Sequence, residues 1–152
     1  MEVNRGGLLP LRREPPATGL EGTFSLEYCL AAALLDGGVG LSSFTDEAVR
    51  RPAVRGLVAM VRAAEGDEAG EFPIGGYAEV RVVLRDGTEH AMRVDVPRGD
   101  PSRPLSWDEL AAKFGDCAGV ALPGGRVERA LRLIERLDGL DNVRGLTEAL
   151  SG

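Results

Sequence analysis

Few side chains in this sequence belong to the types that usually transfer protons or bind metals. The 152 residues include one histidine, His90, one lysine, Lys113, and two cysteines, Cys29 and Cys117, which stand far apart in the chain. A zinc site needs several such ligands at short spacing, so we expect neither a metal nor a cofactor. We interpret His90 as a half-buried strand residue and Lys113 as a solvated helix residue, rather than as a general base.

Tyr28 is the side chain that we single out for binding. It stands in FSLEYCLAAALLDGG, residues 24–38, where apolar residues recur at helical spacing on two opposite faces. This pattern predicts a helix that is buried on both sides, with Ser25 as its N-cap and Gly37 or Gly38 as its left-handed stop. A buried phenol needs a hydrogen-bond partner. That partner is either a backbone group of the core or a ligand, and both interpretations stay open.

Composition excludes several classes of protein. The net charge is −6 and the pI is about 4.9, with acidic and basic residues interspersed. A nucleic-acid-binding surface needs a basic patch, so we expect no nucleic-acid partner. No apolar run is long enough to span a membrane, and residues 1–7 do not read as a signal peptide. We therefore expect a cytoplasmic protein whose cysteines are reduced and buried.

The elements that would position Tyr28 follow from apolar periodicity and from turn residues. The N-terminal segment predicts a strand at Val3 or at residues 8–11, and Pro10, Pro15 and Pro16 confine any strand there to the edge of a sheet. Thr45 or Asp46 is a predicted cap, and Pro52 suits the first turn of a helix. Beyond the central helix within 24–38, we expect helices at 47–50 and 52–59, a strand at 58–64 and a mobile, glycine-rich acidic loop at 65–76.

Residues 77–96 predict a β-hairpin whose register can be argued. A three-residue loop, 85–87, pairs Val82 with His90 and Val80 with Met92, which keeps the apolar side chains on one face. A two-residue loop would mix the two faces. The three-residue loop also places Gly87 at the left-handed position of a bulged turn.

The C-terminal third predicts helices. Ser106 and Glu109 have the spacing of a capping box, and amphipathic helices are expected at 107–118, 125–137 and 142–150, the last capped by Asp141. The whole chain therefore predicts an α+β fold, with a small sheet and a β-hairpin covered by helices, followed by a C-terminal helical tail. We expect a lid-like α+β domain at 1–104 and a helical segment at 105–152.

Four stretches resemble the C-terminal part of the MmgE/PrpD family, from about Arg12 to the end of the chain. They are GLEGTFSLEYCLAAALLDGGVGLSSFTDEAVRRPAVRGLVAMV, VVLRDGTEH, PRGDPSRPLSWDELAAKF and LDGLDNVRGLTEAL, in the family's order. The family includes 2-methylcitrate dehydratase, cis-aconitate decarboxylase and iminodisuccinate epimerase. Its members carry a small α+β lid over a larger helical domain, which supplies most of the catalytic His and Lys residues and is missing here.

The resemblance implies a role for the start of the central helix. In aconitate decarboxylase relatives the tyrosine that matches Tyr28 lines the active-site cleft, so Tyr28 is the catalytic-site candidate, and Ser25 and Thr23 are weaker binding candidates. Many relatives have a basic residue where Thr23 stands and a histidine where Phe24 stands, and this sequence departs from that pattern.

The resemblance also implies a function. We expect the lid module of a lyase or isomerase that acts on a di- or tricarboxylate and is inactive alone, working with a helical-domain partner chain or as a homodimer. The alternative is a non-catalytic binding or scaffold protein that keeps the lid fold. The substrate, and whether the chain is a natural protein, half of a split enzyme or a truncation, stay open.

Overall fold

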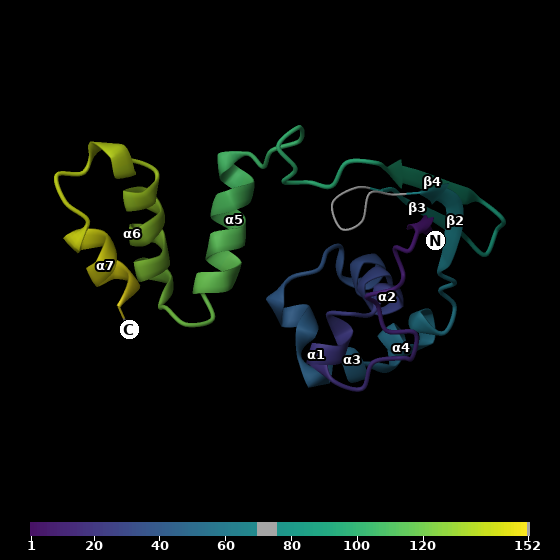
Figure 1. The fold of residues 1–152 in the computed structure, drawn as a ribbon. Coiled ribbons are helices and arrows are strands. Elements are labelled where there is room, and N and C mark those ends of the chain that lie inside the picture. Colours follow the sequence, from purple (N-terminus) through teal and green to yellow (C-terminus); the bar gives the residue numbers. More distant parts are fainter. Residues whose placement is uncertain (70–75, 152) are drawn as a thin grey trace. The chain divides into compact units, whose positions relative to one another are not determined.

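The computed structural model describes residues 1–69 and 76–151. The chain divides into two compact units, Met1–Arg103 and Pro104–Gly152 (Figure 1). The first unit combines a sheet with helices, and the second is helical, so the predicted α+β class is confirmed. Within the described ranges, no helix is both long enough and apolar enough to cross a bilayer.

The sheet of the first unit has four strands in the order β2-β1-β3-β4: β1 (Glu2–Arg5), β2 (Ala64–Ala69), β3 (Ala78–Val83) and β4 (Glu89–Val94). Strand β1 pairs in parallel with β2 and antiparallel with β3. The prediction that the N-terminal strand is an edge strand is therefore wrong. The prolines that suggested it all come after Arg5, so they leave both edges of β1 free to pair.

Strand β2 corrects two further predictions. A strand was expected at 58–64 and a loop from Glu65, but helix α4 (Pro52–Val58) extends to Val58, and the strand is Ala64–Ala69. Its sequence, AEGDEA, has poor strand propensity. Backbone pairing with β1 overrides that propensity. Residues 70–75 of the predicted loop lie outside the described residues.

The hairpin has the predicted register. Val82 pairs with His90 and Val80 with Met92, and the Leu84 N–H donates to the Thr88 carbonyl at 2.8 Å. Gly87 has φ +86°, in the left-handed region. His90 is exposed rather than half-buried, because the helices beside the sheet do not cover this part of β4.

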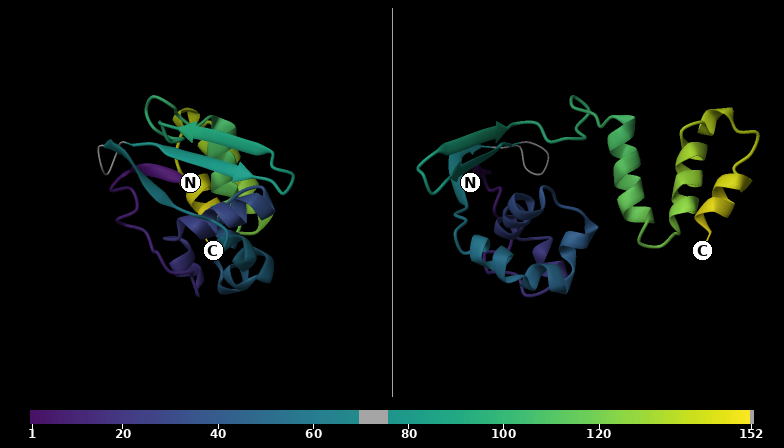
Figure 2. Two further views of the ribbon diagram at one scale, coloured as in Figure 1. Left: turned by 90° about the vertical axis from the view of Figure 1, so that its right-hand side faces the viewer. Right: turned by 180° about the vertical axis from the view of Figure 1, so that it is seen from behind.

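The helices of the first unit lie together on one side of the sheet (Figure 2). They are α1 (Gly19–Gly22), α2 (Leu26–Asp36), the 3-10 helix η1 (Leu41–Phe44), α3 (Asp46–Arg50) and α4. Their core consists of Tyr28, Ala31, Ala32, Val49 and Val54.

Helix α2 is buried on one face only. The face with Tyr28 packs in the core, whereas Leu34 on the other face is 56% exposed. The prediction of burial on both sides is therefore wrong for the described chain. The predicted ends are confirmed, because Ser25 caps the helix and Gly37 ends it with φ +78°.

The second unit consists of α5 (Trp107–Ala118), α6 (Gly124–Ile134), the 3-10 turn η2 (Leu137–Gly139) and α7 (Arg144–Leu150) (Figure 1). The capping box of Ser106 and Glu109 is confirmed. The predicted Asp141 cap is wrong: the neighbouring Asn142 side chain accepts from the Arg144 N–H at 3.0 Å.

Apolar residues of the second unit are only partly covered. Val127, Ala130 and Ala149 are buried, but α5 has no buried residue, and Trp107 is 39% exposed. Cys117, on α5, is also exposed, so the prediction that both cysteines are buried is wrong for it. Its position on the uncovered side of α5 explains the exposure. Lys113 is exposed, as predicted for a solvated helix residue.

Candidate functional site

The candidate site is built around the first turn of α2. The Ser25 hydroxyl accepts a hydrogen bond from the Tyr28 N–H at 3.3 Å, which satisfies one of the unpaired amides that begin every helix. Ser25 is buried at the same point. Ser25 therefore has a structural role as a cap, and its contact with a substrate stays a prediction.

Tyr28 lies in the core with no exposed surface. Its hydroxyl donates a hydrogen bond to the Ser43 carbonyl of η1, and its ring lies 6.1 Å from the Phe44 ring, centroid to centroid. Burial raises the pKa of Tyr28, with Arg51 opposing this effect. The phenol is therefore neutral near pH 7 and acts as a hydrogen-bond donor, not as a base. Its role towards a substrate stays a prediction.

Two cavities adjoin this core. The first, the Tyr28 cavity, has a volume of about 170 Å³ and is lined by Pro15, Pro16, Tyr28, Val49, Arg55, Val58 and Ala59. The second, the glycine-loop hollow, has a volume of about 610 Å³ and lies beside Ser43. Its lining includes Gly37, Gly38, Gly40, Ser42, Thr45 and Arg51.

The arginines near Tyr28 differ in how they are engaged. Arg51 makes two hydrogen bonds to Asp36, one of them 2.9 Å long, which joins the C-terminal end of α2 to the start of α4. This contact holds the pKa of Asp36 below its ordinary value. Arg55 is exposed, and it is the cation that lines the Tyr28 cavity. Sequence reasoning missed Arg55, because nothing in the pattern distinguishes it from the other arginines.

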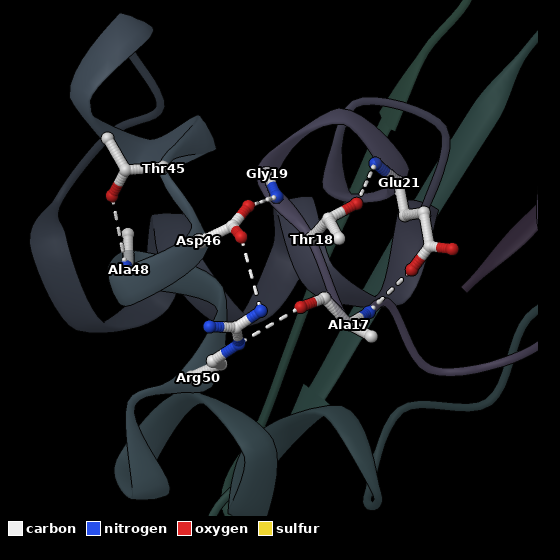
Figure 3. Close-up of polar contacts among 8 residues, drawn as sticks. All are labelled: Ala17, Thr18, Gly19, Glu21, Thr45, Asp46, Ala48 and Arg50. Atoms are coloured by element: carbon white, nitrogen blue, oxygen red, sulfur yellow. Dashed lines mark hydrogen bonds and ion pairs between the residues drawn. The ribbon is translucent and has the colours of Figure 1, made fainter.

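A polar network holds the helices around Tyr28 together (Figure 3). One Asp46 oxygen accepts from the Gly19 N–H at 2.8 Å, and the other accepts from Arg50 at 3.1 Å. Arg50 also donates to the Ala17 carbonyl at 3.2 Å. The network joins the N-terminus of α1 to α3, and both of these helices pack against η1, which carries the Ser43 carbonyl.

Gly19 is required for this packing. A Cβ atom at Gly19 would lie 2.6 Å from the Phe44 carbonyl carbon and closer still to its oxygen. The backbones of α1 and η1 therefore approach each other at a distance that only glycine permits.

The two other candidate groups lie elsewhere. His90 is on β4 and does not line the Tyr28 cavity, and Lys113 belongs to the second unit. Across residues 1–69 and 76–151, no group of three or more His, Cys, Asp or Glu side chains could hold a metal ion. The Tyr28 region therefore offers a hydroxyl, an arginine and apolar walls, which suit binding and positioning rather than proton transfer.

Comparison with known proteins shows the family of this chain. It is 33% identical to cis-aconitate decarboxylase of Homo sapiens over 143 residues and 32% identical to that of Mus musculus over 142 residues. It is 29% identical to cis-aconitate decarboxylase of Aspergillus terreus over 144 residues. These matches cover 91–93% of this chain, which spans only 29–30% of the length of the relatives. Residues 2–139 match the MmgE/PrpD C-terminal domain. The chain therefore belongs to the MmgE/PrpD family and corresponds to its C-terminal domain.

Proposed function

We propose that this chain is the lid module of a lyase or isomerase that acts on a small di- or tricarboxylate, such as cis-aconitate or 2-methylcitrate. The observation that carries the proposal is the match of residues 2–139 to the MmgE/PrpD C-terminal domain, together with relatives that are cis-aconitate decarboxylases. In this proposal the lid works with a helical-domain partner that corresponds to the larger part of those relatives.

The side chains around Tyr28 suggest which catalytic tasks this chain performs and which its partner performs. Decarboxylation breaks a C–C bond beside a carboxylate and leaves an electron pair that must be protonated, whereas dehydration removes a proton beside a carboxylate. Both need a positioned acid or base and cations for the carboxylates. The Tyr28 cavity is lined by Tyr28 and by the cation Arg55. In our proposal these groups bind and orient the substrate, and the partner supplies the proton-transfer groups.

The burial of Tyr28 sets a condition on this role. Its hydroxyl is bonded to the Ser43 carbonyl. A substrate oxygen must therefore replace that carbonyl when the lid closes over the substrate. The movement required is a local shift of η1, which the short Gly37–Gly40 segment connects to α2.

A second candidate is a non-catalytic binding or scaffold protein that keeps the lid fold. The full burial of Tyr28, with its hydroxyl satisfied inside the chain, favours this alternative. A core tyrosine of this kind needs no substrate to explain it.

A chimera tests the two candidates against each other. Residues 2–139 replace the matched region of the human relative, and release of CO₂ from cis-aconitate is measured. We expect turnover, and we expect Tyr28→Phe to lower kcat at least about tenfold, the order expected for one lost transition-state hydrogen bond. Tyr77→Phe is the matched control, because the Tyr77 hydroxyl bonds to Glu2 at the sheet and lines no part of the Tyr28 cavity. A folded but inactive chimera would support the scaffold alternative.

A further inference from the structure

We propose that an apolar hollow between α2 and the sheet is the docking site for a helix from the part of the enzyme that precedes this region in the relatives. The inference rests on the proposed function, since it assigns a contact surface to the same partner. We call this feature the α2–sheet hollow. Its volume is about 220 Å³, and it is lined by Met1, Leu30, Ala33, Leu34, Val61, Arg62, Val80, Arg81 and Val82.

The lining of the α2–sheet hollow is mainly aliphatic. Leu30, Ala33 and Leu34 come from the open face of α2, and Val80 and Val82 come from β3. An apolar cavity of about 150 Å³ holds a benzene molecule. The α2–sheet hollow therefore has room for one large apolar side chain or two small ones from another element.

Apolar surface continues outward from the hollow. Leu34 is 56% exposed, and Met92, which pairs with Val80 across the hairpin, is 70% exposed. Residues of this kind on an open sheet face and an open helix face are normally covered by a further layer. The α2–sheet hollow is thus the deepest part of an uncovered apolar surface, rather than an isolated packing gap.

The position of residue 1 indicates what covers this surface. The Met1 amino group donates to the Arg62 carbonyl at 2.7 Å, and the Ala64 N–H donates to the Met1 carbonyl at 3.0 Å. Residue 1 therefore lies at the rim of the hollow. The match to the MmgE/PrpD C-terminal domain begins at residue 2, and this region is only 29–30% of the relatives. In our proposal, the preceding chain of the relatives therefore enters at this rim.

The geometry favours a helix as the occupant. Consecutive elements of a chain are usually neighbours in space. The helices of this unit all lie on the side of the sheet that carries the hollow (Figure 2). A further helix beside α2 would extend that layer under β4 and place aliphatic side chains in the hollow, as amphipathic helices do in apolar grooves.

Peptide binding tests the inference. The probe is a fluorescent synthetic peptide of about 25 residues, roughly 38 Å as a helix, taken from the human relative directly before its matched region. The full chain of this protein is titrated into the peptide. We expect saturable binding and an increase in the helical circular dichroism signal. Leu34→Glu and Met92→Glu should each weaken binding at least about tenfold, because a carboxylate would face apolar side chains. Both residues are more than half exposed, so both variants should fold.

The matched control is Leu20→Glu, at a leucine on α1 that is 74% exposed and lines no part of the hollow. It should bind like the wild type. Absence of saturable binding, or equal weakening by all three variants, would overturn the inference. A dimer in sedimentation that Leu34→Glu dissociates would assign the hollow to a second copy instead. If the peptide binds but the chimera is inactive, the proposed function is rejected and this inference stands. If the chimera is active but the peptide does not bind, this inference is rejected and the proposed function stands.

Discussion

Gly19→Ala tests whether the close approach of α1 and η1 organises the region around Tyr28. The added methyl group would lie 2.6 Å from the Phe44 carbonyl carbon and 3.0 Å from the Thr45 carbonyl carbon. Because both neighbours are backbone atoms, the strain cannot be relieved by rotating a side chain. The helices must separate, which also lengthens the 2.8 Å hydrogen bond from the Gly19 N–H to Asp46 (Figure 3).

The expected loss of stability can be worked out from these two effects. Overpacking costs about 1–3 kcal/mol, and a hydrogen bond to a charged group contributes about 1.5–3 kcal/mol. Since the two effects are coupled, we expect a combined loss of about 3 kcal/mol. In a unit of this size, about 1 kcal/mol lowers Tm by about 4 °C, so Tm should fall by about 12 °C.

Thermal unfolding followed by far-UV circular dichroism measures this change. Gly56→Ala is the matched control, because Gly56 lies inside α4 and its added Cβ would meet nothing within 4 Å. That variant should gain about 0.5–1 kcal/mol, since alanine suits a helix interior better than glycine. A Tm for Gly19→Ala equal to that of the wild type would refute the proposed packing.

Three further predictions concern other parts of the first unit. Tyr28→Phe should destabilise the chain by about 1–3 kcal/mol in urea unfolding, because it leaves the Ser43 carbonyl without its donor; an unchanged unfolding midpoint would argue against that hydrogen bond. Gly87→Val should destabilise the chain by about 1–2 kcal/mol, because Gly87 has φ +86° and valine tolerates this left-handed backbone poorly. Gly38→Val is the control, at an open position without positive φ, and it should change stability by less than about 0.5 kcal/mol. Equal melting temperatures for the two variants would contradict the left-handed turn at Gly87. The hydrogen bond from Arg93 holds the pKa of Glu68 below its ordinary value, so the stability from Glu68 is present at neutral pH and is lost as pH falls through that lowered pKa. Between about pH 6 and pH 3, Tm should therefore fall further for the wild type than for Glu68→Gln, and parallel curves would count against the ion pair.

Local features were predictable where one physical constraint decides the outcome. The hairpin register follows from keeping Val80 and Val82 on the same face as their partners, and the ends of α2 follow from a serine cap and a glycine stop. Strand β2 was missed because its residues, AEGDEA, carry no strand signal, and only the parallel pairing with β1 makes them a strand. No local pattern contains that long-range contact.

The candidate site was predictable only in part. Tyr28 could be singled out as a buried phenol, but its Ser43 partner belongs to a 3-10 turn that packs closely against Gly19, a contact that no local pattern shows. Arg55 became a candidate only when the fold placed it beside Tyr28. The exposure of one face of α2 could not be predicted. Apolar periodicity identifies the residues that favour burial, but it does not show whether another element of this chain packs against them.

The proposed lid function is tested most directly by assaying the purified chain with cis-aconitate and with 2-methylcitrate. We expect no measurable turnover by the chain alone, because neither His90 nor Lys113 lines the Tyr28 cavity. We expect turnover when the human relative, truncated to lack its matched region, is added. Turnover by the chain alone that His90→Ala abolishes would overturn the lid function and would make His90 the catalytic base.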